Sequence, residues 1–134
     1  ALQGRCIAVI EDDPHIVEAY RQTLSQRGAQ VWVLSEVEDE LQSQLENMDR
    51  LDCILSDYRL KQTTGDVVIQ KLRENFNAEI PAVIVTADTS PAHIHFFSQL
   101  HIPVLHKPVS FQEVAERIEQ AIAQSHAQAA PPTV

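Results

Sequence analysis

The chain has 134 residues, of which 44% are hydrophobic, and a formal net charge of −9 with histidine neutral. This length is enough for one domain with a buried core. The acidic charge argues against nucleic-acid binding, which depends on lysine and arginine side chains that neutralise phosphates. No apolar run approaches the roughly 18 residues of a membrane span, and the start lacks the basic and apolar regions of a signal peptide.

The first part of the chain predicts a strand, a helix and a second strand. Residues 6–10 form a short apolar run that ends at three consecutive carboxylates, residues 11–13. The next segment, 14–27, carries apolar side chains on one helical face. Its first proline suits the first turn of a helix, and Gly28 can end that helix in the left-handed conformation. Valine and tryptophan at 30–34 predict the second strand.

The middle of the chain repeats this alternation. A Ser-x-x-Glu capping box at 35–38 predicts the start of a second helix. A third strand is predicted at 51–56, and it ends at another acid, Asp57. The loop at 57–65 then leads to a third helix, whose apolar side chains extend to Phe76.

The rest of the chain adds two more strands and two more helices. Residues 81–86 predict the fourth strand, and a shorter helix is predicted at 90–100. The fifth strand is predicted at 102–106, and the last helix, at 110–124, begins with a second capping box. We expect the domain to end near residue 125, and 126–134 to be a flexible tail rich in alanine and proline.

Five strand–helix units with near-continuous apolar strands indicate an α/β fold. Such strands are buried on both faces, which predicts a parallel sheet doubly wound by helices. Ligands of open parallel sheets bind at the carboxyl ends of the strands. Five side chains of distinct chemistry follow those ends: Glu11, Asp12, Asp57, Thr86 and Lys107.

Three converging carboxylates are costly to ionise together unless a cation compensates them. Mg²⁺, or Mn²⁺ in its place, suits this role because it prefers oxygen ligands and binds carboxylates together with phosphate. An ammonium group can hold a phosphoryl oxygen, and a hydroxyl can donate a hydrogen bond to it. The five side chains therefore predict phosphoryl transfer to a carboxylate.

The sequence resembles the receiver domain of bacterial two-component response regulators from residue 5 to about residue 124. The resemblance depends on VIEDD, ILSDYRL followed by TTGD, VIVTAD and LHKPVS, each at the end of a predicted strand. It implies a flavodoxin-like five-stranded sheet with strand order 2-1-3-4-5.

The resemblance also implies a role for each residue of the metal site. Asp57 is the phosphoacceptor. Asp12 is expected to bind the metal directly, and Glu11 is expected to act through water. The backbone carbonyl of Arg59 would be a further metal ligand. Asp13 is interpreted as the cap of the first helix rather than as a ligand.

The phosphate-binding residues follow from the other two motifs. Thr86 is the switch hydroxyl, Ala87 is the small residue beside the phosphate, and Lys107 binds the phosphate, with a cis peptide bond expected after it. Asp88 and Arg59 occupy positions that, in the family, tune the lifetime of the phosphate. We expect these two side chains to form a lid that slows hydrolysis.

The implied partner is a histidine kinase or a phosphotransfer domain that donates from phosphohistidine. The implied output is a shift of the face formed by the fourth helix, fifth strand and fifth helix, which is also a possible dimer surface. Val104 stands where the family often has the aromatic residue of this switch, so His106 or the pair Phe96 and Phe97 is expected to take its place. The motifs, together with a first residue that is not Met, suggest that the chain is the C-terminal receiver domain of a hybrid sensor kinase. A stand-alone regulator is the alternative. If the domain does belong to a kinase, any membrane anchor would lie in the rest of that kinase.

Other functions remain open at this point. A degenerate receiver would act as a phosphate-independent binding module. A phosphatase with an aspartate nucleophile would need an acid two residues further on, where Arg59 stands, and a nucleotide-binding protein would need a Gly- or Ser/Thr-rich first loop in place of the acids.

The cysteines and histidines carry less information. Cys6 and Cys53 lie in apolar runs and are interpreted as reduced core thiols of a cytoplasmic protein, with a disulfide or metal pair as the alternative. His93 and His95 do not share a helical face, which argues against a histidine metal site.

Overall fold

The computed structural model describes residues 1–129. Its strands and helices alternate along the chain, as the sequence predicts. The strands are β1 (Cys6–Ile10), β2 (Gln30–Val33), β3 (Cys53–Asp57), β4 (Ala82–Thr86) and β5 (Val104–His106). The helices are α1 (Pro14–Gln26), α2 (Glu38–Leu45), α3 (Gly65–Phe76), α4 (Pro91–Gln99) and α5 (Phe111–Ala129).

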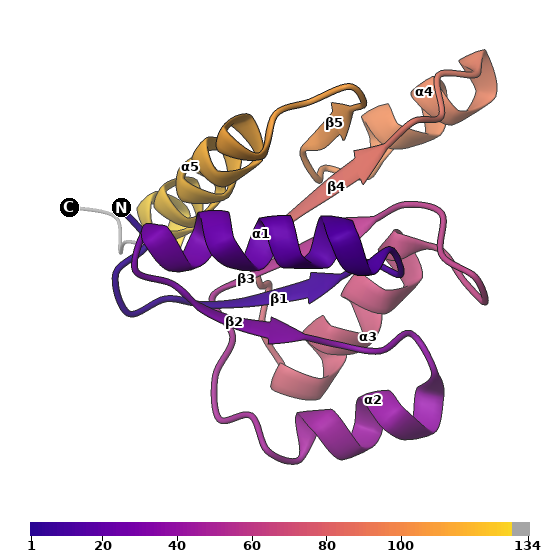
Figure 1. Cartoon of the computed structure of the whole chain (residues 1–134). Helices are drawn as coiled ribbons and strands as arrows, with labels where there is room; N and C mark the ends of the chain where they lie inside the picture. The colour runs from indigo at the N-terminus through magenta and orange to yellow at the C-terminus, as the bar shows by residue number, and fades with distance from the viewer. Residues whose placement is uncertain (130–134) are drawn as a thin grey trace, which may run out of the picture.

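The five strands form one parallel sheet in the order β2-β1-β3-β4-β5, which confirms the predicted topology (Figure 1). Strand β1 pairs with β2 on one side and with β3 on the other. The strand order therefore reverses at β1, and this is the point at which open α/β sheets bind ligands.

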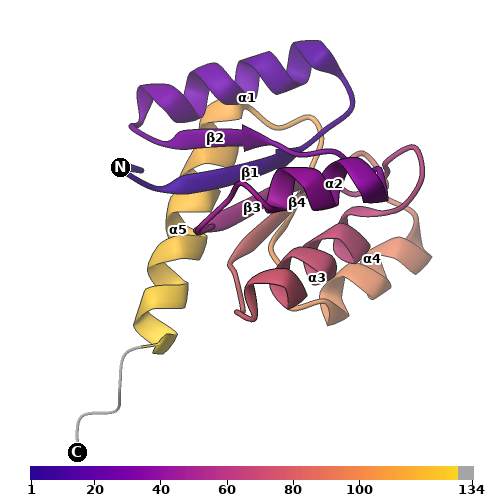
Figure 2. The same cartoon turned by 90° about the horizontal axis from the view of Figure 1, so that it is seen from below.

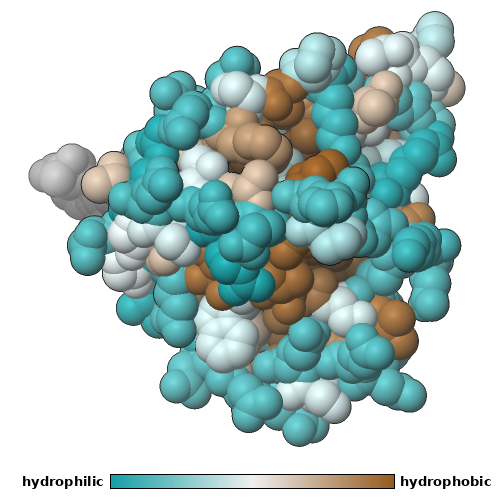
Figure 3. Space-filling model, in the orientation of Figure 1, coloured by the Kyte–Doolittle hydropathy of each residue, from teal (hydrophilic) through white to brown (hydrophobic). Residues whose placement is uncertain are grey.

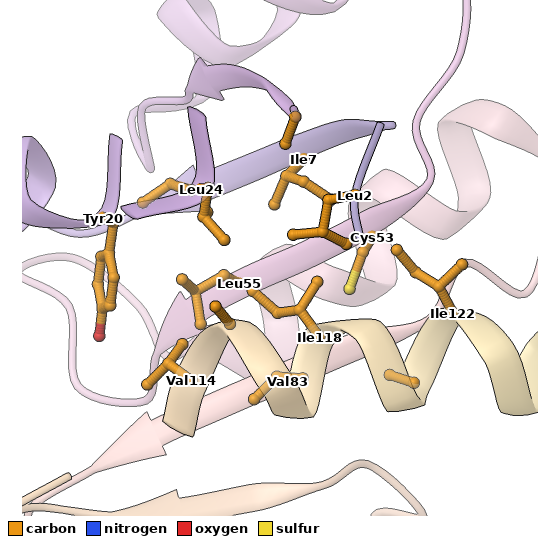
Figure 4. Packing of buried hydrophobic residues seen from close by; sticks show 14 of the residues in the cluster. Leu2, Ile7, Tyr20, Leu24, Cys53, Leu55, Val83, Val114, Ile118 and Ile122 are labelled. Carbon is orange, nitrogen blue, oxygen red and sulfur yellow. The ribbon is translucent and has the colours of Figure 1, made fainter. Parts of the chain in front are cut away.

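Helices cover both faces of the sheet, as Figure 2 shows. Successive residues of a strand point to opposite faces, so Ile7 and Val9 pack toward α1 and α5 while Ala8 and Ile10 pack toward α2, α3 and α4. Figure 4 shows the first of these two cores, in which Ile118 of α5 meets side chains of β1 and β3. Burial on both faces explains why the strands read as continuous apolar runs.

Three of the predicted helix ends are confirmed. The side chain of Asp13 accepts a hydrogen bond from the His15 N–H at 2.9 Å, which caps α1. Gly28 follows α1 with a φ of +94°, a conformation that a residue with a side chain rarely adopts. At the start of α5 the Ser110 hydroxyl accepts from the Glu113 N–H at 3.0 Å, as the second capping box predicts.

The prediction of the first capping box is wrong. Helix α2 begins at Glu38, the residue before it is Val37, and no side chain caps the helix. The Ser35 hydroxyl instead accepts from the Val37 N–H at 3.0 Å in a local turn. The Ser35 N–H donates to Oε1 of Gln44 at 2.8 Å, and Nε2 of Gln44 donates to the Val33 carbonyl at 3.2 Å. These contacts hold the chain extended beyond β2 and delay the helix.

Strand β2 is the edge of the sheet, and Val31 and Val33 remain half-buried there. On the face that Figure 3 shows, hydrophobic side chains lie in the strip between α1 and α2, with hydrophilic side chains around them. The partly apolar edge is therefore narrow and lies between two polar helices.

The last two elements differ in length from the prediction. Strand β5 begins at Val104 rather than at residue 102, and α5 continues to Ala129, past residue 124. Residues 130–134 of the predicted tail lie outside the described residues. None of the helices described between residues 1 and 129 is long and apolar enough to cross a membrane.

Both cysteines are buried and free, as the interpretation of core thiols requires. Burial raises the pKa of the Cys53 thiol to about 12, so this thiol stays protonated at neutral pH.

Candidate functional site

The carboxyl ends of the strands bring the five predicted side chains to one edge of the sheet. Glu11 and Asp12 follow β1, Asp57 is the last residue of β3, and Thr86 is the last residue of β4. Lys107 follows β5, and its peptide bond to Pro108 is cis, as expected.

The three acids converge. One carboxylate oxygen from each of Glu11, Asp12 and Asp57 lies within 4.8 Å of the others. Asp12 is exposed, and the other two side chains are partly buried, so the group is open to solvent on one side. An all-oxygen donor set with an open side fits a hard divalent cation that keeps some of its waters. Among residues 1–129 no other group of at least three histidines, cysteines or acids converges in this way.

The electrostatics of the acids support this fit. Burial raises the pKa of Glu11 to about 7, and the nearby Asp57 carboxylate contributes to the rise. Burial also raises the pKa of Asp57, while the charge of Lys107 opposes that change. The Lys107 ammonium lies 3.7 Å from Oδ2 of Asp57. One ammonium group does not compensate three carboxylates, so a bound cation would relieve the remaining repulsion.

Replacing Glu11 by Gln is expected to stabilise the metal-free protein at pH 8. The folded state binds the Glu11 proton more tightly than the unfolded state, so its stability falls as pH rises from about 4.5 to about 7. One pKa unit corresponds to about 1.4 kcal/mol, and screening of a half-exposed group reduces the total gain to about 1 to 2 kcal/mol. The measurement is urea unfolding in EDTA at pH 8 and at pH 5, where the two proteins should differ little. An equal gain at both pH values would contradict the electrostatic explanation.

Thr86 is almost completely buried, with 1% of its surface exposed. Its hydroxyl oxygen accepts a hydrogen bond from the Asp88 N–H at 3.0 Å. The neighbouring Ala87 is exposed and carries only a methyl group. The hydroxyl is therefore held by the loop that follows β4, and its movement would move that loop.

The predicted pair of Arg59 and Asp88 is present. Nη2 of Arg59 lies 2.5 Å from Oδ2 of Asp88, and the pair joins the loops that follow β3 and β4. The Ser90 N–H and the Arg59 guanidinium lower the pKa of Asp88 to about 2, so this carboxylate is ionised at neutral pH. The Asp88 side chain is only 11% exposed, whereas Arg59 is 62% exposed.

His93 of α4 contacts both members of the Arg59–Asp88 pair and so connects the pair to that helix. Its spacing from His95 argues against a role as a metal ligand. Its Nδ1 lies 2.9 Å from Oδ2 of Asp88, and its Nε2 lies 3.4 Å from Nη2 of Arg59. The ring also packs edge-on to Tyr58, with 5.7 Å between the ring centroids. The sequence indicates only weakly that His93 contacts the site. A histidine three residues after Ser90 is equally consistent with a surface position that has no role in the site.

An aromatic cluster connects the site to the half-buried strand β5. Tyr58 follows Asp57, and its ring lies 4.8 Å from that of Phe97 in α4. Phe97 lies 6.1 Å from the ring of His106, the residue before Lys107. Val104 is half-buried beside this cluster and contributes no ring. The cluster contains His106 as well as Phe96 and Phe97, the two alternatives that the sequence suggests for the missing aromatic side chain.

Comparison with known proteins agrees with this geometry. Residues 7–119 match the family model described as the response regulator receiver domain. A search of curated proteins found no match.

Several solved structures share the fold. A CheY-like receiver domain protein from Methanospirillum hungatei has a TM-score of 0.75 at 20% identity, covering 92% of this chain and 98% of that chain. The receiver domain of a signal transduction histidine kinase from Syntrophus aciditrophicus has a TM-score of 0.76 at 19% identity and 98% coverage of both chains. A sensor protein from a Polaromonas species has a TM-score of 0.73 at 22% identity, covering 90% of this chain and 98% of that chain.

These identities establish the fold alone, whereas the family model spans most of the chain. With the acids, the buried threonine and the lysine gathered at one edge of a 2-1-3-4-5 sheet, the chain belongs to the family of response regulator receiver domains of two-component systems.

Proposed function

We propose that Asp57 accepts a phosphoryl group from a phosphohistidine of a histidine kinase or phosphotransfer domain. The observation that carries the proposal is the position of Asp57, which lies between two further acids and the Lys107 ammonium at 3.7 Å. An Asp57 carboxylate oxygen forms a bond to phosphorus as the bond between phosphorus and the imidazole nitrogen breaks. The electron pair stays on that nitrogen, and the imidazole leaves in its neutral form because its other ring nitrogen carries a proton.

Residues of this chain would hold the metal and the phosphoryl group. Asp12, Asp57 and the Arg59 carbonyl would bind Mg²⁺ or Mn²⁺, with Glu11 acting through water. The bound cation would supply positive charge to the phosphoryl oxygens. Lys107 would bind a further oxygen, and Thr86 would donate its hydroxyl proton to another.

The test is incubation of the protein with a small acyl phosphate, with Mg²⁺ or with EDTA, followed by intact mass measurement. We expect a mass gain of one phosphoryl group with Mg²⁺ and little or none with EDTA, because Lys107 alone cannot neutralise the incoming charge. A gain that is the same in EDTA would contradict the metal site, and no gain in Mg²⁺ would contradict the phosphoacceptor.

Movement of Thr86 toward the phosphate would release its bond to the Asp88 N–H and shift the loop that follows β4. The face formed by α4, β5 and α5 would then change its packing, and we propose this face as the output and dimer surface. Tyr58, Phe97 and His106 connect Asp57 to that face, which supports aromatic coupling without a ring at position 104.

The similarity to a sensor protein and to the receiver domain of a histidine kinase supports the proposal that this domain belongs to such a kinase. A cytoplasmic location is part of the same proposal. The chain itself would modify only its own Asp57.

A double variant, Arg59→Ala with Asp88→Ala, is expected to lose the phosphoryl group from Asp57 several-fold faster. The ion pair joins the loops that follow β3 and β4, and in the proposed lid it would limit the access of water to the acyl phosphate on Asp57. The measurement is the decay of the phosphorylated mass after the donor is removed. A matched control is Lys71→Ala with Glu38→Ala, which removes another exposed ion pair, between α2 and α3. Equal decay in wild type and in the first variant would eliminate the lid.

A further inference from the structure

Glu36, in the connection between β2 and α2, holds the tip of the loop between β3 and α3. Its Oε2 accepts a hydrogen bond from the backbone N–H of Lys61 at 3.0 Å. Its Oε1 accepts from the backbone N–H of Gln62, the next residue. One carboxylate thus binds two consecutive amides that lie about 25 residues further along the chain.

The same loop carries the carbonyl group expected to bind the metal. Arg59 forms an isolated antiparallel bridge with Thr64, and the Leu60 N–H donates to the Thr63 carbonyl at 3.2 Å. The loop is therefore a short hairpin with a fixed base. Its tip, by contrast, is held to the rest of the domain by Glu36, which limits how far the Arg59 peptide can move.

Glu36 also lies next to the acids. It lines a pocket of about 230 Å³ together with Glu11, Asp12 and Lys61. The pocket joins the connections that follow β1, β2 and β3 at the edge of the sheet where the proposed metal site lies.

We propose that Glu36 is a positioning residue for the metal site. By binding the Lys61 and Gln62 amides, it would hold the hairpin that carries the Arg59 carbonyl in a fixed position beside the acids. Groups that orient metal ligands commonly change metal affinity tenfold or more when they are removed. This inference depends on the proposed function, since it assumes that the acids bind Mg²⁺.

The experiment is an NMR titration of the 134-residue protein with MgCl₂, following the backbone amides of Asp57 and Tyr58. Glu36→Ala is expected to raise the Mg²⁺ Kd about tenfold. Glu36→Gln keeps one acceptor oxygen and should give a smaller rise. Glu40→Gln removes the same charge from an exposed position in α2 and should leave the Kd within about twofold of wild type.

Two further measurements separate positioning from simple charge attraction or from stability. The tenfold ratio between the Mg²⁺ Kd of Glu36→Ala and that of the wild type should persist in 1 M KCl, where the electrostatic screening length is about 3 Å. In the metal-free protein, hydrogen exchange of the Lys61 and Gln62 amides should accelerate at least tenfold in Glu36→Ala. The Gly65 amide, which donates to the Tyr58 carbonyl at 2.7 Å, should keep its rate.

A Kd for Glu36→Ala within twofold of wild type, or a difference that disappears in 1 M KCl, would overturn the inference. Thermal unfolding checks that each variant folds, and if Glu36→Ala does not, Glu36→Gln must show the weaker binding and the faster exchange. Absence of any Mg²⁺ response in the wild type is a separate result, because it overturns the proposed metal site itself.

Discussion

Replacing Asp57 by Asn is expected to abolish phosphorylation of the chain. The amide nitrogen and oxygen of Asn are poor nucleophiles, and no negative charge remains to attract the metal and Lys107 to the attacking atom. Asp12 and Glu11 lie within 4.8 Å of Asp57, but both come from the loop that follows β1 and do not occupy the strand end beside Lys107. Intact mass after incubation with Mg²⁺ and an acyl phosphate should therefore show only unmodified protein.

Asp49→Asn is a suitable control for this result. Asp49 is exposed and precedes β3, at the opposite end of the sheet from the acids, so its loss removes the same charge without touching the site. We expect this variant to accept the phosphoryl group at the wild-type rate. Phosphoryl uptake by Asp57→Asn, at Asp12 or anywhere else, would show that Asp57 is not the sole acceptor.

Replacing Gly65 by Ala is expected to destabilise the fold by about 3 kcal/mol. A Cβ atom at this position would lie 2.4 Å from the Asp57 carbonyl oxygen and 2.8 Å from the Ser56 hydroxyl oxygen. The first contact is with strand backbone, which cannot move without disturbing the pairing of β3 with β4. Urea unfolding at constant pH measures the loss. The displaced Asp57 backbone should also weaken Mg²⁺ binding in the fraction that folds.

Gly4→Ala separates steric conflict from conformational strain. Gly4 has a φ of +74°, and a Cβ atom there would meet no atom within 4 Å apart from its chain neighbours, so only the left-handed backbone is penalised. We expect a loss of about 1 kcal/mol there. If Gly65→Ala cost no more than Gly4→Ala, helix α3 would have to start in a different place from the one described.

The strand ends could be predicted because the rule that locates them is local. Each of β1, β3 and β4 is an apolar run that ends at a polar residue, and parallel pairing brings those ends together whatever the loops do. Asp57, Thr86 and Lys107 followed from this rule and from the family motifs. The helix caps at Asp13 and Ser110 were equally local, since each depends on a side chain and an amide two or three residues away.

The contacts that the sequence did not reveal join residues far apart in the chain. His93 contacts Arg59 across 34 positions, and Glu36 binds the Gln62 amide across 26. No spacing rule connects such residues, because the packing of whole helices decides where they meet. The prediction that Ser35 caps a helix was wrong for a related reason. Gln44, nine positions away, binds the Ser35 N–H and competes with the capping box that the local pattern favours.

Gln44 has a further consequence for the edge of the sheet. Leu34 donates its N–H to Val9 of β1, so the Val33 carbonyl and the Ser35 N–H point outward from the sheet. The Gln44 amide binds both, as one residue of an additional parallel strand would. These two backbone groups are therefore not free to pair with a strand of a neighbouring chain. Gln44 thus opposes polymerisation of the domain by strand addition at the β2 edge, where Val31 and Val33 are only half-buried.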